Sequence, residues 1–185
     1  MALEIIGARL LSPAFGSSVD VWAAVISVFI LSLSVGYVLG GRLADHVTTN
    51  AALGVTIAVA GMFYCVLPVY AWPLTGALES LHDKRYGSLV AGLLLFLPPS
   101  LMLGMVSPML VKLVFTRAES VGRTTGTLYA IGSVGNVLGV LVADYFLLVL
   151  FKDNSNLIGM GAILIVVGLA HLFIKVRNNT AVAQL

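Results

Sequence analysis

Long apolar runs separated by short polar breaks fill the chain from end to end. Five of them cover approximately residues 20–41, 51–70, 88–115, 126–151 and 157–176. A helix needs about 20 apolar residues to cross a bilayer core of roughly 30 Å, so each run predicts one transmembrane helix. Residues 1–13 form a shorter apolar run of about half that length. Three explanations stay open for it: a start codon placed too far downstream or a fragment of a longer chain, which we favour, and a segment lying partly at the membrane surface.

This pattern predicts an all-α fold, a polytopic membrane helix bundle with five full spans plus a truncated first span. We expect a single transmembrane domain over residues 1–176, followed by a polar tail over 177–185. Composition agrees, because 59% of the residues are hydrophobic and 10% are charged, against roughly 45–50% and about 25% in soluble domains. Lipid must cover the excess apolar surface. The net charge of +2 is too small to indicate nucleic-acid binding.

Lysine and arginine predict the orientation of the bundle. The breaks after the second, fourth and sixth spans hold Arg42, Lys112, Arg117, Arg123, Lys175 and Arg177, and the opposite side holds Lys84, Arg85 and Lys152. Because cytoplasmic loops carry the excess of basic residues, we expect the loop over residues 42–50 and the C-terminus to be cytoplasmic. The expected location is the inner membrane of a bacterium or an archaeon.

Small residues recur every four positions in the second and fifth spans. Gly36 and Gly40 lie on one line of the second span, and Gly135 and Gly139 repeat the spacing in the fifth. Such a face lets the backbone of another helix approach closely. We therefore expect these four glycines to be sites of helix packing.

Prolines interrupt the fourth span. Pro98 and Pro99 lie near its middle, and Pro108 follows after Gly104. Proline removes a backbone donor and clashes with the preceding turn, so the pair is expected to bend or break the helix. We favour a kinked structural helix. The alternative is a broken helix that lines a binding site, in which Pro98 and Pro99 would be candidate site residues.

Three ionisable residues lie at bilayer depth, where a charge is costly unless it is paired or hydrated. They are Glu4, Arg9 and Asp144, at depths of roughly 13, 6 and 10 Å from the same surface by helical rise. We expect Arg9 to pair with Asp144 and pin the first span to the fifth. In the functional alternative, Glu4 offers its carboxylate to a cation or a proton.

The sequence contains no constellation that predicts catalysis. No histidine, cysteine or carboxylate has partners at metal-ligand spacing, and the serines near Pro13 have no histidine close by. We therefore expect no catalytic residue, no metal site and no cofactor in this chain.

The stretch Gly41–Asp45 resembles the front half of the glycine-x-x-x-aspartate loop between the second and third helices of major facilitator transporters. Gly41, Arg42 and Asp45 match that loop, while the segment from His46 to Asn50 lacks its basic residues and second glycine. The resemblance implies a cytoplasmic loop and a bundle that forms one half of a major facilitator fold.

A second set of motifs follows in order along nearly the whole chain. It comprises Glu4, Arg9–Pro13, Phe15–Ser18, Gly36–Asp45, Leu97–Pro108 and Gly122–Ala130. Together these resemble the membrane domain of the spermidine-synthase-like membrane proteins, which fuse a major-facilitator-like domain to an aminopropyltransferase. No such soluble domain follows the last span here, so no catalytic residue is carried over.

Two functions are compatible with these resemblances. The first is a non-catalytic membrane domain that anchors or regulates a soluble aminopropyltransferase-like partner of polyamine metabolism. The alternative is a half-size, homodimeric, major-facilitator-like transporter of a small solute, with a cation as one candidate. A half that exposes the small-residue faces of its second and fifth spans needs a second half, which another copy would supply.

Overall fold

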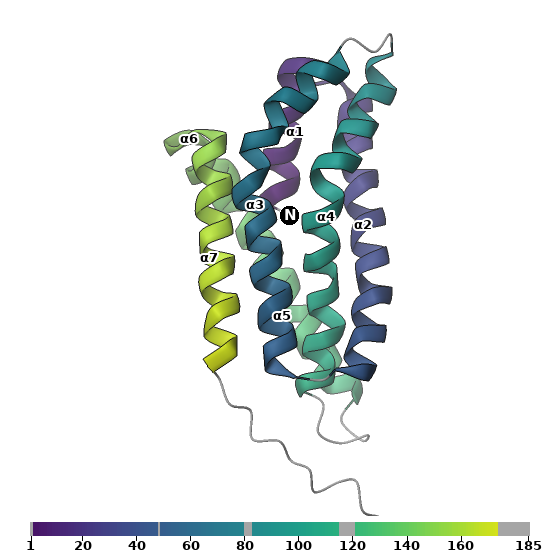
Figure 1. The fold of residues 1–185 in the computed structure, drawn as a ribbon, viewed down its shortest axis with the longest axis vertical. Coiled ribbons are helices and arrows are strands. Elements are labelled where there is room, and N and C mark those ends of the chain that lie inside the picture. Colours follow the sequence, from purple (N-terminus) through teal and green to yellow (C-terminus); the bar gives the residue numbers. More distant parts are fainter. Residues whose placement is uncertain (1, 48, 80–82, 115–120, 174–185) are drawn as a thin grey trace, which may run out of the picture.

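The computed structural model describes residues 2–47, 49–79, 83–114 and 121–173, and these fold entirely into helices. Figure 1 shows the helices running side by side along one long axis. In chain order they are α1 (Ala2–Phe15), α2 (Val19–His46), α3 (Asn50–Glu79), α4 (Lys84–Val114), α5 (Val121–Val142), the π-helix η2 (Ala143–Leu147), α6 (Leu148–Leu150) and α7 (Asp153–Phe173).

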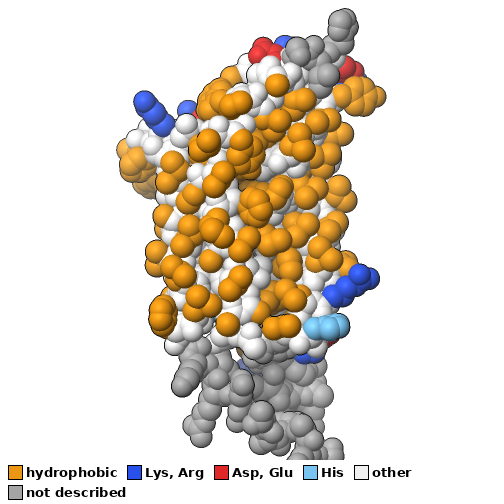
Figure 2. Space-filling view, viewed as in Figure 1, with side chains coloured by type: hydrophobic (Ala, Val, Ile, Leu, Met, Phe, Trp, Pro, Cys, Tyr) orange, Lys and Arg blue, Asp and Glu red, His pale blue; other side chains and the backbone are white. Residues whose placement is uncertain are grey.

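Five segments are long and apolar enough to cross a membrane: α2, α3, α4, α7, and the segment formed by α5, η2 and α6. Apolar side chains cover the sides of the bundle, and charged side chains gather toward its ends (Figure 2). The all-helical prediction and the five full spans are therefore confirmed. The short α1 has 14 residues and begins near mid-height of the bundle (Figure 1).

Glycines bring two pairs of helices into backbone contact. A Cβ added at Gly36 would lie 2.9 Å from the Cα of Gly104, and one at Gly40 would lie 2.5 Å from the Cα of Met105, so α2 packs directly on α4. In the same way α3 meets α7, where a Cβ on Gly61 would lie 2.6 Å from the carbonyl oxygen of Gly161. The four-residue spacing of Gly36 and Gly40 predicted that α2 packs closely on another helix. The close contact between α3 and α7 was not predicted.

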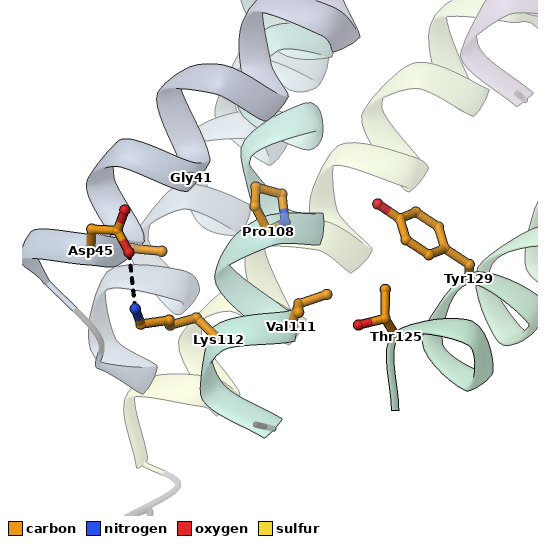
Figure 3. Close-up of a pocket in the computed structure, with 8 residues that line it drawn as sticks. Gly41, Asp45, Pro108, Val111, Lys112, Thr125 and Tyr129 are labelled. Atoms are coloured by element: carbon orange, nitrogen blue, oxygen red, sulfur yellow. Dashed lines mark hydrogen bonds and ion pairs between the residues drawn. The ribbon is translucent and has the colours of Figure 1, made fainter. Parts of the chain in front are cut away.

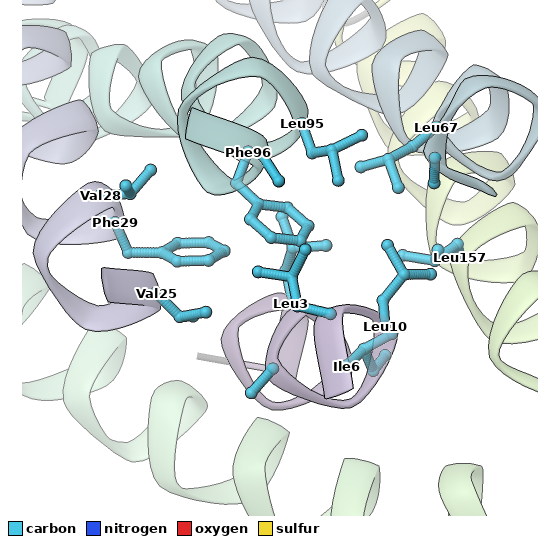
Figure 4. Close-up of a cluster of buried hydrophobic side chains, with 14 of the residues drawn as sticks. Leu3, Ile6, Leu10, Val25, Val28, Phe29, Leu67, Leu95, Phe96 and Leu157 are labelled. Carbon is cyan, nitrogen blue, oxygen red and sulfur yellow. The ribbon is translucent and has the colours of Figure 1, made fainter. Parts of the chain in front are cut away.

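The main apolar core forms around α1 (Figure 4). Ile6 and Leu11 of α1 are fully buried, and the α1 side chains face Phe96 of α4 and Phe29 of α2. The rings of Phe29 and Phe96 stack with centroids 5.4 Å apart. The 14 residues of α1 are thus held by packing against neighbouring helices.

The prolines do not break the fourth span. Pro98, Pro99 and Pro108 lie inside the single helix α4, so the broken helix that would line a site is absent. Each proline removes one backbone hydrogen bond, but close packing on both sides can hold the helix together. Here α4 is packed against α2 and α3.

The fifth span contains a feature that the sequence did not reveal. After Val142, the chain widens into η2 before α6 completes the span. A π-helix shifts the face that following residues present. As a result, Asp144 lies in an irregular segment, with its side chain exposed.

Replacing Gly40 and Gly41 by alanine tests whether the α2–α4 contact depends on glycine. Gly40→Ala forces a Cβ against Met105, and we expect it to lower the free energy of unfolding by about 1–3 kcal/mol, as overpacking does. Gly41 has nothing within 4 Å of an added Cβ. Gly41→Ala should therefore leave stability unchanged or raise it by up to about 1 kcal/mol, because alanine is the better helix former. Unfolding in detergent micelles measures both, and equal effects would contradict the contact.

Candidate functional site

The least packed helix of the bundle is α5. Only 6% of the apolar window of its span is buried, against 39–50% for α2, α3 and α4. A Cβ added at Gly132, Gly135 or Gly139 would meet no described atom within 4 Å. Space is therefore left beside α5, and two cavities lie there.

The first, which we call the mouth cavity, has a volume of about 540 Å³ and lies at the end of the bundle where α2 meets α3. Figure 3 shows Asp45 of α2 and Lys112 of α4 on one side, and Thr125 and Tyr129 of α5 on the other. Gly41 also lines it. Two of the loop-motif residues thus border a cavity, whereas Arg42 does not and is exposed. Thr125 and Tyr129 were missed, because nothing in the sequence pairs them with α2.

An ion pair joins α2 to α4 beside the mouth cavity. The Nζ of Lys112 donates a hydrogen bond of 2.9 Å to Oδ1 of Asp45. Asp45 lies one residue before the end of α2. Both side chains are about half exposed or more, so water screens the pair and its contribution to stability is small.

The second cavity, the inner cavity, has a volume of about 300 Å³ and is bordered by residues from α1, α3, α4, α5 and α7. Ala2, the first described residue of α1, lines it, as do Tyr64 of α3 and Asn136 of α5. Gly135 and Gly139 also face this space. An added Cβ at either glycine meets no described atom within 4 Å, so the helix packing expected of Gly135 and Gly139 stays a prediction.

The two cavities follow one another along α5. Tyr129 lines the mouth cavity and Gly135 the inner one, and six helical residues correspond to about 9 Å along the axis. Among the described residues, the mouth cavity carries an ion pair, while the inner cavity has no ionisable side chain except the phenol of Tyr64. Polarity therefore falls from the end of the bundle toward its middle.

The expected pair between Arg9 and Asp144 is wrong. The Nε of Arg9 lies 3.3 Å from Oδ1 of Asp153, and its Nη1 donates to the carbonyl oxygen of Leu148. Asp144 makes no ion pair with a described residue. Asp144 lies in η2 with its side chain exposed, whereas Asp153 lies at the start of α7. The pair ties α1 to α6 and α7.

The other candidates stay outside the two cavities. Glu4 is partly buried on α1, and neither it nor Pro98 and Pro99 lines the mouth cavity or the inner cavity. Within the described ranges, the structure has no group of three or more histidine, cysteine or acidic side chains that could hold a metal ion.

Five helices of sufficient length and apolar character are compatible with an integral membrane protein. Comparison of the chain with protein-family models, curated proteins and solved structures finds no match. Function must therefore be argued from the cavities themselves.

A double-mutant cycle tests the partner of Arg9. Arg9→Gln combined with Asp153→Asn should show a coupling energy of about 0.2–1 kcal/mol in the free energy of unfolding, the range for exposed ion pairs. Arg9→Gln combined with Asp144→Asn is the matched control and should be additive. Coupling to Asp144 instead of Asp153 would contradict the pairing.

Proposed function

We propose that this protein is one half of a homodimeric membrane transporter for a small solute. The observation that carries this proposal is the pair of cavities along α5, one at an end of the bundle and one deeper inside it. Transporters commonly bind their solute near the middle of the bilayer, at the interface of two structural halves. A single chain offers one such half.

The outer surface of α5 is suited to contact a second copy. Ile131, Val134, Leu138 and Leu141 follow each other at spacings of three and four residues, and each side chain is about half exposed or more. This spacing forms the seam through which two helices pack knobs into holes. A symmetric contact uses the same patch on both copies, so one seam is sufficient to close a dimer.

The small-residue face of α2 no longer supports this assembly. Gly36 and Gly40 are already used by α4, so a dimer contact through Gly40, which the spacing of α2 suggested, is excluded by packing within the chain. The proposed contact is therefore confined to α5.

An anchor for an aminopropyltransferase-like enzyme is the other proposal, and it rests on the sequence resemblance. The mouth cavity, with its exposed ion pair, would be the surface available to such a partner. The inner cavity has no role in that function, whereas a transporter uses both, and for this reason we place transport first.

Cysteine cross-linking tests the α5 contact. In a background in which Cys65 is replaced by alanine, we expect Leu138→Cys to give a covalent dimer in membranes, because the side chain would meet its copy across the two-fold axis. Ile30 of α2 has a similar exposure, 60% against 56%, and Ile30→Cys is the matched control. Cross-linking at both positions, or at neither, would contradict a contact through α5.

Solute flux tests transport itself. Vesicles containing the protein should take up at least one of a panel of polyamines, amino acids and uncharged alcohols faster than protein-free vesicles do. Gly41→Trp should reduce that uptake at least severalfold, because it fills the mouth cavity from a position with open space around it. Gly76→Trp, at an equally open glycine of α3, is the control. The absence of any uptake, or equal uptake by both variants, would argue against transport through this cavity.

A further inference from the structure

The inner cavity contains polar groups that the chain leaves without partners. Tyr64 is only 2% exposed and lines the cavity, and its hydroxyl bonds to no described residue. The hydroxyl oxygen is not among the buried side-chain atoms that lack a partner, so part of its surface is accessible. Asn136, an exposed residue of α5, borders the same space, and its carboxamide bonds to no described residue. Unsatisfied polar groups are costly inside a bilayer, which favours a molecule that bonds to them.

The rest of the lining is apolar. Leu103 of α4 and Leu164 of α7 provide the walls, and Gly135 and Gly139 leave the backbone of α5 open. The volume of about 300 Å³ lies at the lower end of the range for small-molecule sites, roughly 300–1,000 Å³. The cavity is therefore matched to a small molecule.

Charge excludes whole classes of ligand. Among the residues that the structure describes, no acidic side chain, lysine, arginine or histidine lines the inner cavity. A polyamine or an amino acid would bring a charge into a site without a counter-charge, and such a transfer is strongly unfavourable. The same argument excludes a cation, one of the candidate solutes considered from the sequence, as a ligand of the inner cavity.

We propose that the inner cavity binds an uncharged, mainly apolar molecule through one hydroxyl, carbonyl or amide group held between Tyr64 and Asn136. The tyrosine hydroxyl and the carboxamide can each donate and accept a hydrogen bond, so either polarity of group is satisfied. The proposal deepens the transport function by giving its solute class and rests on that function for its physiological meaning. Binding itself can be measured without transport.

Photolabelling of the purified protein tests the site. The probe is octanol carrying a diazirine, and the matched charged probe is octylammonium carrying the same diazirine. We expect the alcohol to label peptides containing Tyr64 or Asn136, and an excess of unlabelled octanol to compete. The ammonium probe should give no competed label there. Peptide mass spectrometry reads both results.

A variant that fills the inner cavity gives the decisive test of binding there. Gly139→Leu places a side chain in open space at the cavity wall and should abolish the competed label. Gly132→Leu makes the same change at an open glycine of α5 that lines neither cavity, and its label should equal that of the wild type. Tyr64→Phe removes one oxygen and should weaken competition about threefold to tenfold, the loss expected for one hydrogen bond.

Three results would overturn the proposal: competed labelling by the ammonium probe, competed labelling that survives Gly139→Leu, or no competed label on either peptide. If the label behaves as expected while vesicles show no flux, the site stands and the transport function fails. If neither peptide is labelled but vesicles show flux that Gly139→Leu leaves intact, the transport function stands and the site fails.

Discussion

Backbone contact at glycine is the constraint on which the rest of the bundle depends. In lipid, apolar side chains gain little by meeting each other, so helices associate where small residues allow close packing. Gly36 and Gly104 join α2 to α4, and Gly61 and Gly161 join α3 to α7. With α3 packed on α4, these contacts make a continuous array. The prolines of α4 are tolerated because that helix lies inside the array.

The cavities lie beside α5, a helix that these glycine contacts do not hold. α1 packs tightly, with Ile6 and Leu11 fully buried, and its Ala2 borders the inner cavity. An added Cβ at Gly135 or Gly139 of α5 meets no described atom within 4 Å. Among the described residues, the same glycine spacing therefore has two outcomes: close contact with α4 in α2, and open space in α5.

The helices that depend on periodicity and composition could be predicted from the sequence, but the contacts between one helix and another could not. Apolar runs located the five spans, since lipid imposes their length. They could not show that Gly61 faces α7, nor that Tyr129 lies across a cavity from Asp45, because such pairings arise only when helices pack. Arg9 was assigned to the wrong carboxylate for a related reason. The π-helix η2, in which Asp144 lies, carries no signal in the residue pattern.

The placement of charge links the fold to the proposed site. Each of the ion pairs Arg9 with Asp153, Asp20 with Arg85, and Asp45 with Lys112 has at least one side chain that is half exposed or more, and charged side chains gather toward the ends of the bundle (Figure 2). Helix ends can hold charges at low cost because water reaches them, whereas the described lining of the inner cavity is mainly glycine, aliphatic and aromatic residues. Tyr64 and Asn136 are the polar side chains among these described residues, and neither bonds to another described residue. The constraint that lets these helices assemble in lipid therefore also limits what the space between them can bind.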